Sequence, residues 1–167
     1  MTDQQAPRLW ADSDDDSTPA ELIERYLAGP TLLRDTVAGM NSAQLHAKPI
    51  LGKMSTQEVV NHIVDSELRM VERMRRAIAG DEPLVMQGRP APQQQPERDV
   101  EADLQLLRGT REQIAVDLRP LEPKVWGRVA MKREDRVVTL RQLLVHTTHH
   151  LENHVATIQE KRVALGL

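Results

Sequence analysis

Four of the six histidines of this chain lie within one stretch, LRQLLVHTTHHLENHVATI, residues 140–158. The stretch reads as one helix, and His146 and His150 sit four residues apart in it. On a helix that spacing stacks two side chains on one face, about one turn apart. Two imidazoles placed in this way can share one metal ion, as the paired histidines of helical zinc sites do. A metal site needs at least three protein ligands, so the rest of the chain must supply a third.

The composition restricts the chemistry that such a site could do. The chain contains no cysteine, which excludes disulfides, cysteine nucleophiles and thiolate ligands, so any metal must use histidine and carboxylate side chains. A net charge of -3 gives no support for nucleic-acid binding. No segment approaches about 18 consecutive apolar residues, and the polar start does not resemble a signal peptide. We therefore expect a cytoplasmic protein without membrane or nucleic-acid partners.

Four helical stretches account for most of the chain. Apolar residues recur at helical spacing through residues 19–40, 55–80, 99–118 and 139–158, and no convincing parallel-strand pattern interrupts them. Helix-capping motifs open three of these stretches: Thr18-Pro19, Ser55-Thr-Gln-Glu58 and Thr139-Leu-Arg-Gln142. Aromatic residues make up only 2% of the chain, which fits the aliphatic core of a helix bundle better than a sheet. The pattern predicts an all-α fold, a four-helix bundle whose neighbour order the spacing leaves open.

The remaining segments indicate one domain with two long connections. Residues 1–17 are polar and acidic, and we expect a flexible tail before a bundle domain of residues 18–167. Residues 81–98, after the second helix, are rich in proline and glutamine and predict a long crossover that could form a lid or a pocket wall. Residues 119–137, after the third helix, predict a connection with a small hairpin around KREDR, and Trp126 is expected to cap one end of the core.

Two charged residues fall on the apolar faces of their helices. Glu67 lies near the middle of the apolar stripe of residues 55–80, and Arg111 lies between Leu107 and Ile114 on the stripe of the third helix. A carboxylate that faces a core must be paired or protonated. We predict that Glu67 and Arg111 pair inside the bundle. The alternative is that each side chain reaches water separately.

His62 is the first candidate for the third metal ligand. It lies at the edge of the apolar stripe of the second helix, as His146 and His150 do on the last one, and bundles build metal sites where such edges meet. The sequence therefore predicts a metal site at His62, His146 and His150, while a lone histidine such as His62 is more often structural or exposed. His154 lies close to the stripe, as a core histidine or as a support for the ligands, and it could replace one of the three. Three neutral imidazoles suit zinc, nickel, cobalt, iron or copper and leave one position open.

These residues resemble the DinB/YfiT-like superfamily of metal-dependent enzymes. The resemblance is carried by NHIVDSELRMVERMRRAIAG and HTTHHLENHVATI, with support from YLAGPTLLRDTVAGM, the ST-x-E-x-x-x-H start of the second helix, the arginine of the third helix, and Trp126 before VTLRQLLVH. It implies a four-helix bundle in up-down-down-up order. It also implies a divalent metal, zinc or nickel first, held by His62 on the second helix and by His146 and His150 on the last.

The resemblance implies an enzyme, a thiol S-transferase or hydrolase. Its metal would activate water or a low-molecular-weight thiol, such as bacillithiol or mycothiol, toward a small-molecule substrate. Arg89 and Arg98 could bind a substrate carboxylate, or they could be solvated loop charges. No catalytic residue is assigned beyond the ligands.

Two other functions stay open. One is a non-catalytic metal-binding or stress-related module, whose site a fourth ligand such as His154 or Glu58 would close. The other is a metal-free bundle that binds a protein partner through an apolar patch. A homodimer is compatible with any of these readings.

Overall fold

The computed structural model describes residues 15–85, 98–133 and 136–167. The first 14 residues of the expected tail and residues 86–97 of the expected crossover lie outside the described part. The elements, in chain order, are helices α1 (Pro19–Val37), α2 (Ser42–His46) and α3 (Thr56–Ala79), strand β1 (Leu84–Val85), helix α4 (Val100–Leu118), the 3₁₀ helix η2 (Pro123–Gly127), strands β2 (Val129–Lys132) and β3 (Val137–Thr139), and helix α5 (Leu140–Ala164).

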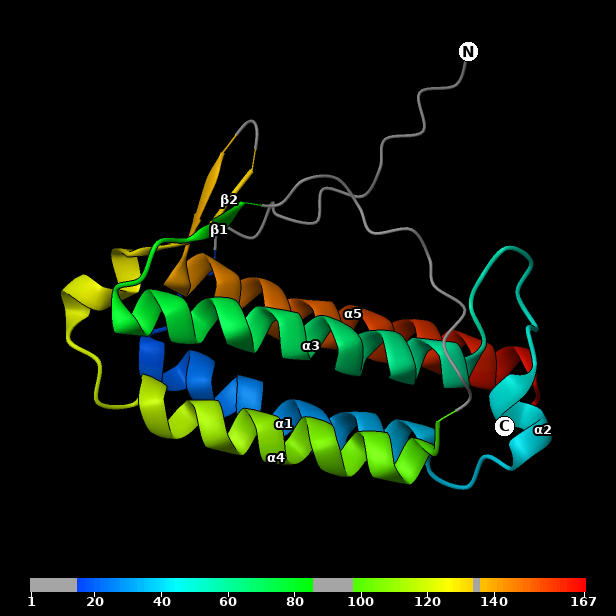
Figure 1. Ribbon diagram of the computed structural model, residues 1–167. Helices are drawn as coiled ribbons and strands as arrows, with labels where there is room; N and C mark the ends of the chain where they lie inside the picture. Colours follow the sequence, from blue (N-terminus) through cyan, green and yellow to red (C-terminus); the bar gives the residue numbers. More distant parts are fainter. Residues whose placement is uncertain (1–14, 86–97, 134–135) are drawn as a thin grey trace, which may run out of the picture.

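Helices α1, α3, α4 and α5 form a four-helix bundle (Figure 1). α1 packs against α4 and α5, and α3 packs against the same two helices, so α1 and α3 occupy opposite corners. α1 and α5 run in one direction and α3 and α4 in the other (Figure 1). This is the up-down-down-up order, and it confirms the expected all-α bundle. Because α3 and α4 are parallel, the end of α3 and the start of α4 lie at opposite ends of the bundle.

Side-chain caps begin the helices at the residues that the sequence indicates. The side chains of Thr18, Ser55 and Thr139 each accept a hydrogen bond from the backbone three residues on, and each forms a complete capping box. Asp99 caps α4 in the same way through Ala102 N–H. Such caps satisfy backbone donors that a helix leaves free, so the starts of all four long helices are encoded locally.

A small sheet lies at one end of the bundle (Figure 1). β2 and β3 pair antiparallel, which confirms the hairpin expected around KREDR, although residues 134–135 lie outside the described part. β1 adds a short parallel strand, with Leu84 opposite Met131. A strand of two residues has no periodicity to read, and this pairing was not expected from the sequence. Trp126 is buried in the core beside this sheet, as predicted.

The apolar core is divided into two clusters along the bundle axis. One cluster lies toward the sheet and includes Met70, Ile114 and Leu144, and the other lies toward α2 and includes Val64 and Leu107. A polar layer of Glu67, Arg111 and Thr147 falls between the two clusters on α3, α4 and α5. Within the described residues, no helix is both long and apolar enough to cross a membrane.

Candidate metal centre

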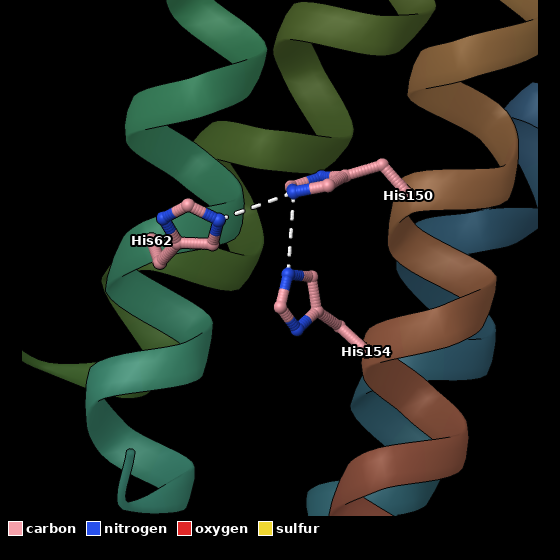
Figure 2. A group of neighbouring side chains, drawn as sticks. All are labelled: His62, His150 and His154. Atoms are coloured by element: carbon pink, nitrogen blue, oxygen red, sulfur yellow. Dashed lines mark hydrogen bonds between the residues drawn. The ribbon is translucent and has the colours of Figure 1, made fainter. Parts of the chain in front are cut away.

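Three histidine side chains converge where the antiparallel helices α3 and α5 pack together (Figure 2). The Nε2 atom of His150 lies 3.1 Å from Nε2 of His62 and 3.2 Å from Nε2 of His154. One ring nitrogen from each of the three residues lies within 4.8 Å of the other two. Among the histidine, aspartate and glutamate side chains that the structure describes, these three form the group with this geometry.

The spacing of the nitrogens fits a tetrahedral metal site. Zinc binds imidazole nitrogen at about 2.0–2.1 Å, which in a tetrahedron places two nitrogens about 3.3 Å apart. The two short separations around His150, 3.1 and 3.2 Å, are close to that value. Two facing Nε2 atoms can share at most one proton, so such a cluster has acceptor nitrogens available. The donor set therefore suits a cation such as zinc or nickel.

Burial keeps two of these rings neutral. Burial lowers the pKa of His150 to about 2, with further contributions from the neighbouring charges of His154, His62, His146 and Arg111. The pKa of His154 is lowered to about 4, again by burial first and by His62 second. A neutral imidazole is the form that binds a metal, so the site favours a cation over protons at neutral pH.

His146, which the sequence predicts as a ligand, lies on α5 one turn before His150. Its ring is buried and its centroid lies 5.7 Å from that of His150, yet its nitrogens do not belong to the group of three. His154, one turn after His150, lies within that group, and its ring centroid is 5.0 Å from that of His62. The pairs His146–His150 and His150–His154 on α5 have the same spacing of four residues. The position of His62 on α3 brings its ring to His150 and His154. The sequence predicts His154 as a core or supporting histidine that could replace one of the three ligands, and in the structure it lies within the group.

Glu67 and Arg111 form the buried ion pair that the sequence predicts. Arg111 Nη2 donates to Glu67 Oε2 at 2.7 Å, and Arg111 Nη1 donates to the backbone oxygen of Tyr26 at 2.8 Å. The hydroxyl of Tyr26 donates to Glu67 Oε1, and the hydroxyl of Thr147 donates to Glu67 Oε2 at 3.2 Å. The four residues come from α1, α3, α4 and α5, and Thr147 is three residues before His150. The network therefore sets the position of α5 next to the histidines.

Arg98, a candidate for carboxylate binding, is engaged by protein carboxylates. Its Nη1 donates to Asp65 Oδ1 at 2.7 Å and its Nη2 to Asp103 Oδ2 at 3.1 Å. The pair with Asp65 joins the residue before the cap of α4 to α3, and the pair with Asp103 joins it to α4. Arg89, the other candidate, lies outside the described residues.

Comparison with known proteins finds a matching family model and similar solved structures. A family model for the DinB superfamily matches residues 25–158. YfiT from Bacillus subtilis, described as a probable metal-dependent hydrolase with an unusual four-helix bundle topology, superposes with a TM-score of 0.79. The two chains are 21% identical, and the match covers 90% of this chain and 91% of that one, a likeness that supports the fold. No curated protein matches this sequence.

Proposed function

Because the chain belongs to the DinB superfamily, we propose that it is a metal-dependent enzyme whose divalent ion is held by His62, His150 and His154. The convergence of three Nε2 or Nδ1 atoms within 4.8 Å of one another carries this proposal. All three side chains are partly exposed, so a fourth coordination position can face solvent or substrate. Three protein ligands with one open position are typical of catalytic rather than structural sites.

The reaction class follows from what can occupy that open position. When bound, zinc or nickel supplies a Lewis acid that lowers the pKa of a water or thiol placed there. The chain has no cysteine, so a thiol would have to be a low-molecular-weight compound. We therefore propose either hydrolysis or transfer of such a thiol to a small-molecule electrophile. The description of YfiT as a probable hydrolase favours water.

The protein's own residues orient the site. His62 is presented by α3 and the other two ligands by α5, so the site is sensitive to how these helices are placed relative to each other. The Glu67–Arg111 pair holds that placement, because its partners lie on the same two helices and on α1 and α4. Burial of His150 and His154 keeps their imidazoles neutral, so one ring nitrogen of each lacks a proton and can act as a ligand.

A structural metal module is the second candidate, because a fourth imidazole is close. His146 is buried, and its ring centroid lies 5.7 Å from that of His150. Structural zinc sites usually have four protein ligands, and a fourth histidine would exclude substrate. Glu58 is a poorer fourth ligand, since it accepts from Lys48 at 2.8 Å and from the Ser55 backbone. Cobalt-substituted protein separates the two: an added thiol changes the visible spectrum of an open site and leaves a closed one unchanged.

Turnover tests the enzyme proposal directly. Metal-loaded and metal-free protein would be assayed with activated esters for hydrolysis, and with an aromatic electrophile plus several small thiols for transfer. We expect turnover only with metal, and its loss in His154→Ala. If fully loaded protein turned over no substrate with water or with any thiol, the metal module would replace the enzyme.

The substrate class, the cellular location and the oligomeric state are proposed together with this function. We propose a small-molecule substrate, a cytoplasmic location and a homodimer. Light scattering of the purified protein would test the dimer, since a mass near 18.9 kDa would indicate a monomer.

A further inference from the structure

Lys161, near the end of α5, is buried, and no partner for its amine lies among the residues that the structure describes. The residue is 1% exposed, and its Nζ atom makes no hydrogen bond within the described structure. A buried ammonium without a counter-ion is strongly unfavourable, and a buried neutral amine also loses its hydrogen bonds to water. Buried polar groups in native proteins nearly always have partners. We therefore expect that a bound ligand supplies the partner of the Lys161 amine.

The position of Lys161 connects it to the candidate metal centre. It follows His154 by seven residues, which is two turns along the same face of α5. That separation is about 10.5 Å along the helix axis, and helical side chains lean toward the N-terminus, here toward the histidines. The charge of Lys161 also contributes to lowering the pKa of His154. The amine thus lies on the same face of α5 as His154 and on the side that leans toward the histidines.

The start of α3 faces the same lysine. Burial lowers the pKa of Lys161 most, and the next contributions come from Glu58, which raises it, and Lys53, which lowers it. Glu58 is already bonded to Lys48. The hydroxyl of Thr56, a residue that is 1% exposed, also makes no hydrogen bond to any part of the chain that the structure describes. The start of α3 and the end of α5 lie at the same end of the bundle (Figure 1), so two unsatisfied groups lie on adjoining helices there.

Building on the proposed metal centre, we infer that Lys161 binds a carboxylate of the molecule that reacts there, with the Thr56 hydroxyl as a second donor. One ammonium in a low-dielectric environment is neutralised by one negative charge, whereas a phosphate dianion would leave an excess charge buried. The substrate class is therefore a small monocarboxylate whose thiol or reacting carbon lies a few bonds from the acid. Lys161 would decide which molecules enter, while the histidines hold the metal.

Paired probes of equal length test this assignment. The probes are 3-mercaptopropionate and 3-mercaptopropanol, which differ in the acid group, and their affinities would be measured by calorimetry on cobalt-loaded protein. We expect wild type to prefer the acid by about tenfold, the size of a charge-assisted hydrogen bond. Lys161→Met should bind both probes equally. Lys53→Met, a matched loss of an exposed lysine that acts electrostatically on the same group, should keep the preference.

The outcomes separate this inference from the proposed function. Equal affinities in wild type, or a preference that survives in Lys161→Met, would overturn the role of Lys161 while the metal centre stands. If the wild type took up no metal, the proposed function would fail, and the role of Lys161 would be tested by propionate binding to metal-free protein. Loss of propionate binding in Lys161→Met would support that role. Equal binding by wild type and Lys161→Met would overturn it.

Thermal unfolding of the same variants gives an independent readout. Met has nearly the length of Lys and removes a buried unpaired charge, so Lys161→Met should be at least as stable as wild type. A lower unfolding temperature for Lys161→Met than for Lys53→Met would mean that the amine already has a structural partner, and this would overturn the inference.

Discussion

The guanidinium of Arg111 and the carboxylate of Glu67 meet at 2.7 Å in the middle of the bundle, with side chains that are 1% and 3% exposed. The guanidinium carbon also lies 4.2 Å from the centroid of the Tyr26 ring, in a cation–π contact. Because the partners come from all four long helices, sliding one helix by a turn would leave a charge buried alone. We infer that this pair selects one register of the bundle, and through it the positions of the histidines.

Removing one partner of the Glu67–Arg111 pair should lower the stability of the fold strongly, whereas replacing both partners should lower it much less. Glu67→Ala leaves Arg111 buried without a counter-ion, and we expect a loss of about 3–5 kcal/mol in the free energy of unfolding. The double replacement Glu67→Met with Arg111→Met should recover much of that loss, because an apolar core of similar volume needs no counter-charge. Urea unfolding followed by circular dichroism measures both.

An exposed ion pair serves as the control for this experiment. Glu112→Ala removes the partner of Arg108, whose Nε lies 2.7 Å from the Glu112 carboxylate on the surface of α4. Solvent screens such a pair, so no measurable loss is expected. A loss at Glu67 no larger than that at Glu112 would contradict the role of the buried pair.

Two glycines within helices should respond in opposite ways to alanine. A Cβ at Gly29 on α1 would collide with Arg111 Nη1 and lie 3.2 Å from both Leu151 methyl groups, whereas a Cβ at Gly109 on α4 would meet nothing within 4 Å. Gly109→Ala should stabilise the protein by about 0.5–1 kcal/mol through helix propensity. Gly29→Ala should destabilise it by about 1–3 kcal/mol through overpacking. Thermal or urea unfolding compares the two, and equal stabilisation would refute the close approach of Arg111 to α1.

Local signals were enough to predict the helices and the buried pair. The boxes opened by Thr18, Ser55 and Thr139 are short-range patterns, and the structure shows all three. Glu67 and Arg111 could be paired because each is a lone charge on an apolar stripe. The contribution of Thr147 to the same network could not be read in this way, because a threonine hydroxyl can also bond to its own helix.

Local sequence patterns do not distinguish His146 from His154 as the third member of the histidine group. Two histidine pairs with the same spacing share His150, and both flank the apolar stripe of α5. Only the axial position of His62 relative to α5, set by long-range packing of α3, distinguishes them. Lys161 carries a local signal of burial, since it continues the apolar stripe of α5 three residues after Ile158.

Acid should destabilise the metal-free protein through its histidines. His150 and His154 have pKa values lowered to about 2 and about 4 by burial, whereas an unfolded histidine titrates near 6.5. Between these values the unfolded chain binds more protons, so stability is retained above about pH 6.5 and falls as pH decreases below it. The slope should approach about 1.4 kcal/mol per pH unit for each histidine.

Urea unfolding of metal-free protein between pH 7.5 and pH 5 measures this slope. His154→Gln removes one of the two titrating groups, so its stability should depend less steeply on pH than that of wild type. Identical slopes for the two proteins would show that His154 is not held neutral by the fold.

The metal content per chain tests the metal centre most directly. It would be measured by mass spectrometry on protein that is purified without a metal-affinity tag and then incubated with zinc or nickel. We predict about one ion per chain in wild type, retained in His146→Ala and lost in His62→Ala, His150→Ala and His154→Ala. Retention in His154→Ala together with loss in His146→Ala would return the third ligand to His146. Absence of metal from wild type would contradict the metal centre itself.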